Sequence, residues 1–216
     1  MTENVHIVVL TYTEFGEKSI VLHTITKEYG RRGFLVRPGK KTPMTLFQPM
    51  NLLEASVSEN HRSSLSSAHG FSAADPLAGI RSDIRKSAIT MFMSEVLYRV
   101  VRDGAREEGM FEWLEKSIIT LERLETDFSN FHLRFLLELA VILGFSPSSQ
   151  DLLPFAGEHV ANLTRLVTSS FSESMMIPLS GAERTALCDI IIRYLEHYTE
   201  SSIRIRSLSV LHDLFA

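Results

Sequence analysis

Residues 1–75 carry their apolar side chains in short runs of the kind that form β-strands. Val5–Thr13 and Ser19–Thr26 are rich in β-branched residues and flank Phe15-Gly16-Glu17-Lys18, which predicts a hairpin. Pro49 demands an edge or a bulge in a later run, because proline cannot donate a ladder hydrogen bond. The third, fourth and weaker fifth strands are expected at 34–37, 46–57 and 63–69. Strands at this short, even spacing predict a small β-barrel.

From about residue 80 onward the apolar residues recur at helical spacing. Ile84, Ala88, Val96 and Val100 trace a stripe that predicts a long central helix. Further helices are expected at 111–121, 128–142, 158–169, 180–198 and 206–215, with a loop over 145–157. Ser180 with Glu183 three residues later would form a capping box at a helix start.

The change of period near Pro76 and Gly79 predicts two domains. The first is a small β-barrel over 1–75, and the second is an all-helical domain over 76–216. The expected fold class is therefore α+β, with the small β-barrel at the N-terminus.

Composition limits the class of protein. Apolar residues make up 44% of the 216 residues, which is enough to bury a core. No apolar run of about eighteen residues and no signal-peptide pattern is present. We therefore expect a soluble, cytoplasmic protein with no membrane partner. Cys188 is the sole cysteine, so disulfides within the chain are excluded and a cysteine-built zinc site is not expected.

Positive charge is concentrated between Lys27 and Lys41, although the chain as a whole has a net charge of −4. Six Lys and Arg residues in this stretch face one acid, Glu28. Gly30 and Gly33 bracket two arginines as in a tight turn, and Pro38-Gly39 begins a second loop. We therefore expect two cationic loops, 30–33 and 37–42, to meet on one side of the barrel and bind DNA phosphates.

The candidate DNA-binding residues are six cations that neutralise phosphates and two rings that stack on bases. They are Lys27, Arg31, Arg32, Arg37, Lys40 and Lys41, with Tyr29 and Phe34 as the rings. The alternative interpretation is a set of solvated loop charges that keep the barrel soluble.

Motifs for catalysis are not found. The segment from Gly33 to Thr42 has the composition of a phosphate-binding P-loop, but its glycine spacing is one residue too long and Lys41 replaces the hydroxyl that binds magnesium. The eight histidines lack metal-site spacing, and His132 is interpreted as a helix-surface or satisfied core histidine. We therefore predict that the chain is not an enzyme and has no catalytic residue, cofactor or metal.

Several short segments, in a fixed order over nearly the whole chain, carry a family resemblance. In the first third they are Ile7-Val8-Val9-Leu10, Phe15-Gly16-Glu17-Lys18-Ser19, Thr24–Tyr29-Gly30-Arg31 and Leu46-Phe47-Gln48-Pro49. Further along they are Ile84-Arg85-Lys86-Ser87-Ala88-Ile89, Asn130-Phe131-His132-Leu133, Leu143-Gly144-Phe145 and Arg206-Ser207-Leu208-Ser209-Val210-Leu211. In this order they resemble the bacterial RecO family of recombination mediators, above all its Bacteroidetes branch.

The resemblance implies an oligonucleotide/oligosaccharide-binding (OB) barrel, a helical C-terminal domain and a non-enzymatic role in DNA repair. That role is to assist the loading of RecA onto single-stranded DNA and to anneal complementary strands. The implied partners are single- and double-stranded DNA, RecR, and the acidic C-terminal tail of the single-stranded-DNA-binding protein. Candidate cations for that tail are Arg134, Arg165, Arg193, Arg204 and Arg206.

Two expectations stay open beside this reading. Some family members carry a four-cysteine zinc motif after the position of Gly144-Phe145-Ser146-Pro147, and this chain does not, so no metal is carried over. The alternative function is a protein-interaction adaptor that recruits repair partners through its helical domain, with weak or no DNA binding.

Overall fold

The computed structural model describes residues 2–40, 42–58 and 65–215. The chain divides into two compact units: Met1–Ala78 with Val101–Ile119, and Gly79–Val100 with Thr120–Ala216. The strands belong to the first unit and most of the helices to the second. The α+β class is confirmed, while the division into domains 1–75 and 76–216 stays a prediction.

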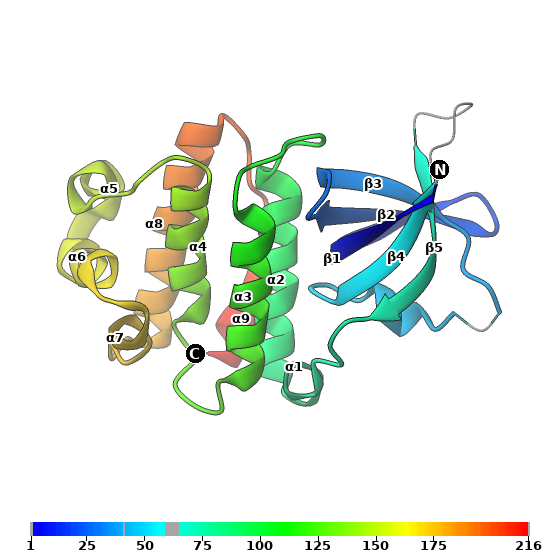
Figure 1. Ribbon diagram of the computed structural model, residues 1–216. Coiled ribbons are helices and arrows are strands. Elements are labelled where there is room, and N and C mark those ends of the chain that lie inside the picture. The colour runs from blue at the N-terminus through cyan, green and yellow to red at the C-terminus, as the bar shows by residue number, and fades with distance from the viewer. Residues whose placement is uncertain (1, 41, 59–64, 216) are drawn as a thin grey trace. The chain divides into compact units, whose positions relative to one another are not determined.

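Five strands close into a barrel in the first unit (Figure 1). Their bounds are β1 Thr2–Phe15, β2 Ser19–Thr26, β3 Gly30–Val36, β4 Leu52–Ser58 and β5 Ser66–Ala73. The strand order is β1-β2-β3-β5-β4, and β4 returns to pair with β1. Among the strand pairs of the described residues, β3 and β5 run parallel and the others antiparallel. This is the five-stranded arrangement of an OB-type barrel, so the predicted barrel is confirmed.

The barrel is filled by the inward-facing residues of its strands, which alternate with outward-facing ones. Its buried core is formed by Val5, Ile7, Val9, Ile20, Leu22, Phe34, Val36, Phe47, Leu53, Ala55, Val57 and Ala68. Half-buried Tyr29, Leu46 and Phe71 pack against this core. Each large side chain removed from water contributes about 1.5–3 kcal/mol, so packing holds the barrel together.

The third strand begins earlier than the sequence indicates. β3 already starts at Gly30, and Arg31 and Gly33 pair with Ile25 and His23 of β2. The predicted tight turn over Gly30–Gly33 is therefore wrong. Gly30 keeps the positive φ of a turn residue, at 68°, but it is the first residue of the strand.

The fourth strand begins later than expected. Residues Met44–Phe47 form a short 3-10 helix, η1, and β4 starts at Leu52. Pro49 lies between them, where its missing N–H interrupts no ladder. The fifth strand is confirmed, at Ser66–Ala73, and residues 63–64 of its expected range lie outside the described residues.

Helices account for most of the remaining chain. Their bounds are α1 Ala78–Ser82, α2 Ile84–Val100, α3 Met110–Arg123, α4 Phe131–Ile142, α5 Ser149–Ala156, η2 Gly157–His159, α6 Val160–Thr168, α7 Phe171–Met175, α8 Gly181–Thr199 and α9 Ser207–Leu214. Within the described residues, none of these helices has the length and apolarity needed to cross a membrane.

Helix caps explain where the predictions succeed and fail. The capping box of Ser180 and Glu183 is confirmed at the start of α8. The loop expected over 145–157 is wrong, because Ser148 and Asp151 form a second capping box that begins α5. This box uses Asp in place of the usual Glu, and Ser170 with Glu173 forms a further box at the start of α7.

The segment that follows α2 completes the open edge of β3. Arg31 N donates to Ala105 O at 2.8 Å, and Gly104 N donates to Arg31 O at 2.8 Å. β5 pairs with β3 only from Phe34 to Val36, so it does not reach Arg31. The bonds to Gly104 and Ala105 therefore satisfy the backbone N–H and C=O of Arg31 on that edge. A Cβ on Gly30 would lie 2.3 Å from Ala105 O, so the close approach requires glycine.

Glu95 of α2 holds the start of α9 within the second unit. Its carboxylate accepts hydrogen bonds from Arg206 N and from Ser207 N, both at 2.9 Å, and from Ser207 Oγ at 2.8 Å. Partial burial opposes ionisation, but these hydrogen bonds outweigh it and lower the pKa of Glu95. The carboxylate thus replaces a side-chain N-cap, which α9 lacks.

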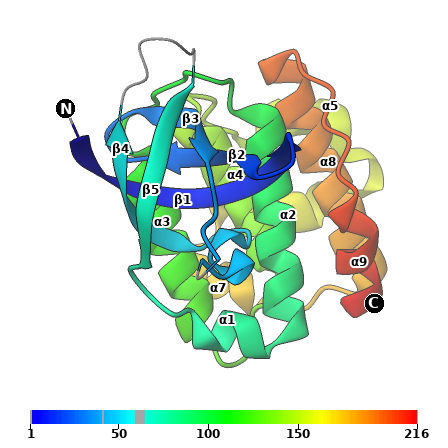
Figure 2. The same ribbon diagram turned by 90° about the vertical axis from the view of Figure 1, so that its right-hand side faces the viewer.

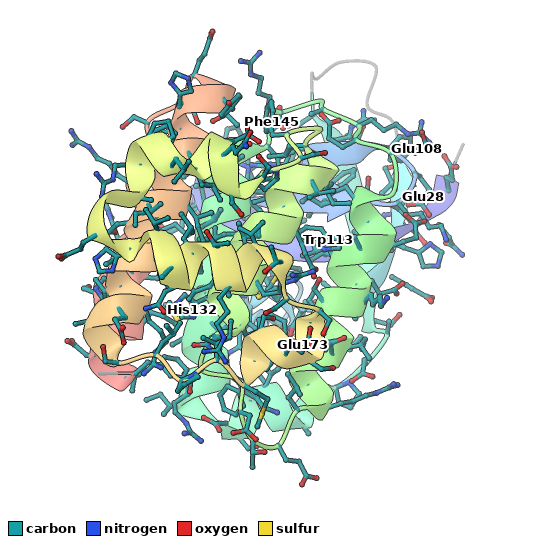
Figure 3. All side chains as sticks on the ribbon, turned by 90° about the vertical axis from the view of Figure 1, so that its left-hand side faces the viewer. Glu28, Glu108, Trp113, His132, Phe145 and Glu173 are labelled. Carbon is teal, nitrogen blue, oxygen red and sulfur yellow. The ribbon has the colours of Figure 1, made fainter. Side chains whose placement is uncertain are left out.

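His132 is a core residue of the second unit (Figure 3). Its ring lies 6.0 Å from that of Phe92 and 6.2 Å from that of Phe215. Burial, together with the positive charge of Arg184 and the neighbouring His212, lowers the pKa of His132 from 6.5 to about 3. The imidazole is therefore neutral at physiological pH.

Acidification should destabilise the fold through His132. The folded-state pKa lies below the unfolded value, so the unfolded chain binds the proton first and the free energy of unfolding falls from about pH 6.5 towards pH 3. The loss is about 1.4 kcal/mol per pH unit. Denaturant unfolding of the wild type and His132→Gln measures it, and the wild type should lose about 2 kcal/mol more between pH 7 and pH 5. Parallel losses in the two proteins would contradict this role.

Candidate nucleic-acid interface

The basic stretch is divided between the two ends of the barrel. In the antiparallel β2–β3 pair, Thr26 meets Gly30 at one end and Ile20 meets Val36 at the other. We call residues 26–30 the turn end, and residues 15–19 with 37–43 the exit end. The six residue steps of β3 separate the two ends by about 20 Å. The expected convergence of loops 30–33 and 37–42 is therefore wrong.

Lys27 at the turn end and Arg32 close to it already have partners. Lys27 Nζ lies 3.6 Å from Glu112 Oε1. The guanidinium of Arg32 lies over the ring of Tyr29, 4.8 Å from its centroid, and the Tyr29 hydroxyl donates to Glu3. Lys27, Arg32 and Tyr29 would have to exchange these contacts to bind a nucleic acid.

Two of the predicted residues lie in the interior. Arg31 is 4% exposed and Phe34 is 0% exposed. Phe34 faces into the barrel, so its ring cannot stack on a base. Arg31 is buried, so its guanidinium is not accessible to phosphates. Burial and the positive charge of Arg31 lower the pKa of His23, whose strand neighbour is Gly33.

The turn end also carries a rim of acids. A cavity of about 510 Å³ there is lined by Lys27 and Arg106 but also by three glutamates, Glu107, Glu108 and Glu112. Glu28, which like Glu108 is labelled in Figure 3, accepts a hydrogen bond from His6 N at 3.0 Å. This excess of negative charge disfavours phosphate at the turn end.

Cations at the exit end are free of such partners. Arg37 and Lys40 are exposed and belong to none of the ion pairs among the described residues. They lie on the connection that leaves β3 and crosses the viewer's side of the barrel towards η1 (Figure 2). Lys41, the remaining predicted cation, lies outside the described residues.

The β1–β2 hairpin adds a cation and two rings to the exit end. Because Ile20 pairs with Val36, the hairpin tip with Lys18 lies next to the start of the 37–43 connection. Phe15 is 56% exposed and Tyr12 is 40% exposed on the same hairpin. Glu14 and Glu17 also belong to it, so the net positive charge comes from Lys18 together with the 37–43 connection.

A second cavity opens at the exit end. Its volume is about 230 Å³, and its lining includes Arg37, Thr42, Leu46, His69 and Phe71. Sequence reasoning missed His69 and Phe71, because they come from β5, more than thirty residues after Arg37. No local signal links them to the basic stretch; the parallel pairing of β3 with β5 brings them to it.

The described residues offer little to support catalysis. They contain no group of three or more His, Cys, Asp or Glu side chains able to hold a metal ion. Cys188 is fully buried, and burial raises the pKa of its thiol, so a reactive thiolate does not form. The interface is chemically suited to binding.

Comparison with known proteins gives one consistent result. Residues 1–76 match the family "Recombination protein O N terminal", and residues 81–151 match "Recombination protein O C terminal". The chain is 27% identical to "DNA repair protein RecO" of Flavobacterium johnsoniae, over 97% of each chain. It is 28% identical to the protein of that name from Phocaeicola vulgatus over 97% of each chain, and 27% to that from Bacteroides fragilis over 96% of this chain and 97% of the other.

Proposed function

The chain belongs to the recombination protein O family, and we propose that it is a DNA-binding recombination mediator in DNA repair. The family is non-enzymatic, which fits an interface without catalytic groups. One observation supports DNA binding by this particular chain: the exit end of an OB-type barrel presents cations that have no ion-pair partner among the described residues, beside exposed rings.

Single-stranded DNA would bind at the exit end through phosphates and bases together. Arg37, Lys40 and Lys18 neutralise phosphates, while Phe15 and Tyr12 offer faces for stacking. Bases within a duplex are already stacked and cannot reach those rings. Binding to double-stranded DNA would therefore depend on phosphate contacts alone and be weaker.

The mediator role extends to loading RecA onto single-stranded DNA and annealing complementary strands, with RecR as partner. It also includes contact with the acidic tail of the single-stranded-DNA-binding protein. Of the five candidate arginines for that tail, Arg134 donates to Glu138 Oε1 at 2.7 Å and to Ser169 O at 2.9 Å. The exposed candidates are Arg165, Arg193, Arg204 and Arg206.

A titration of labelled single-stranded oligonucleotide, followed by fluorescence anisotropy, tests the DNA-binding role. If three phosphates are contacted, log affinity should fall with log salt at a slope of about −2. A DNA duplex that contains the same sequence should bind more weakly than the single strand. Failure of the wild type to bind single strands at low salt would contradict the proposal.

The adaptor alternative is favoured by the acidic rim of the turn end, which suits protein partners better than DNA. Pulldowns with purified RecR and single-stranded-DNA-binding protein, with and without nuclease, separate the two functions. If the partners are still captured after nuclease treatment and the chain shows no affinity for DNA, the protein acts as an adaptor and not as a DNA-binding mediator.

A further inference from the structure

We propose that the cavity at the exit end holds one unpaired base of a bound single strand. The inference rests on the proposed function, because a strand must first engage Arg37 and Lys40. It adds a base-binding subsite in which β5 residues join Arg37 of the basic stretch.

Size limits what the cavity can hold. Its volume of about 230 Å³ is below the roughly 300–1,000 Å³ of sites that enclose a whole small ligand. A flat group such as a single nucleobase fits, whereas a base pair does not. The subsite therefore selects single strands over duplex.

The lining has the chemistry that a base requires. Val36, Leu46, Ala68 and Phe71 supply an apolar surface, and a half-buried ring such as that of Phe71 offers a stacking face. Thr42 and His69 add a hydroxyl and an imidazole that can hydrogen-bond to base edges. A phosphate alone would leave the apolar part of this lining unused.

The subsite is preformed in the DNA-free protein. Phe71 packs edge-to-face on Phe47, with ring centroids 5.1 Å apart and an interplanar angle of 85°. Phe47 is 1% exposed and belongs to the barrel core, so the ring of Phe71 is held in place. Little side-chain freedom is then lost when a base enters.

Arg37 links the cavity to the phosphate path. It lines the cavity and is the first residue after β3, next to the hairpin tip that carries Lys18. A strand whose phosphate is neutralised by Arg37 therefore has its base within reach of the cavity. Stacking does not depend on base identity, so the subsite accepts any sequence.

The test compares an oligothymidine with an abasic oligonucleotide of the same length and charge. For the wild type, the oligothymidine should bind at least about 5-fold more tightly, because the base in the cavity and any base stacked on another ring both add to the difference. Phe71→Leu keeps apolar volume in the core but removes the ring. It should lower this ratio about 5-fold or more, and it should leave affinity for the abasic strand unchanged. His69→Ala, on the exposed rim, should lower the ratio less than Phe71→Leu does.

A second measurement needs no variant and so does not depend on the folding of Phe71→Leu. Photocrosslinking of the wild type to an oligonucleotide containing 5-iododeoxyuridine should place adducts on the tryptic peptide 63–81, which contains His69 and Phe71. Adducts confined to other peptides, or a ratio that Phe71→Leu does not change, would overturn the subsite. Absence of wild-type binding to both oligonucleotides would overturn the proposed function, and with it this inference.

Discussion

Replacing Arg37 and Lys40 together by alanine should weaken single-stranded DNA binding about 60-fold at 50 mM salt. Each phosphate contact on a single strand releases about 0.7 counterion, which is worth roughly 8-fold in affinity at that salt concentration. Both side chains are exposed and unpaired among the described residues, so no competing ion pair reduces their contribution. The salt slope should become shallower by about 1.4.

Lys27→Ala is the matched control for this double variant. Lys27 is also an exposed cation of the barrel, but it lies at the turn end and 3.6 Å from Glu112. We expect its affinity to stay within about 2-fold of the wild type, since exposed ion pairs contribute little and no phosphate is lost. A larger loss for Lys27→Ala than for the double variant would place the DNA at the turn end.

Gly30→Ala should lower the free energy of unfolding by about 2–5 kcal/mol. An L-residue at φ +68° costs about 1–2 kcal/mol, and overpacking adds about 1–3 kcal/mol or more. The added Cβ would lie 2.3 Å from Ala105 O and 2.9 Å from Arg106 Cα, both backbone atoms that no side-chain rotation can move away. The segment around Ala105 would have to leave the edge of β3. Denaturant unfolding measures the loss.

Gly16→Ala separates the two contributions. Gly16 has the same φ of +68°, but an added Cβ there meets nothing within 4 Å. Gly16→Ala should therefore lower the free energy of unfolding only by the cost of the positive φ, about 1–2 kcal/mol. Equal losses at Gly16 and Gly30 would show that the Ala105 segment is not held tightly against β3.

Local signals made much of the fold predictable. The β1–β2 hairpin follows from β-branched runs on either side of a glycine-containing turn, and α8 from the capping box at Ser180. Each of these elements is specified by residues close together in the chain. The start of β3 was missed because its deciding contact, Ala105, lies more than seventy residues away.

The site was less predictable for a geometric reason. The five described cations between Lys27 and Lys40 are neighbours in sequence, but they occupy a strand and its two ends. The strand that joins them therefore also separates them. Side chains alternate between the two faces of a strand, and Phe34 lies on the face that points into the barrel core. Conversely, His69 and Phe71 join Arg37 only through the closing of the barrel, which a local pattern does not reveal.

Protection of lysines from acetylation tests most directly whether DNA occupies the exit end. A saturating single-stranded oligonucleotide should slow acetylation of Lys40 and Lys18, and it should leave Lys27 as reactive as in the free protein. Protection of Lys27 with Lys40 and Lys18 unaffected would contradict the account.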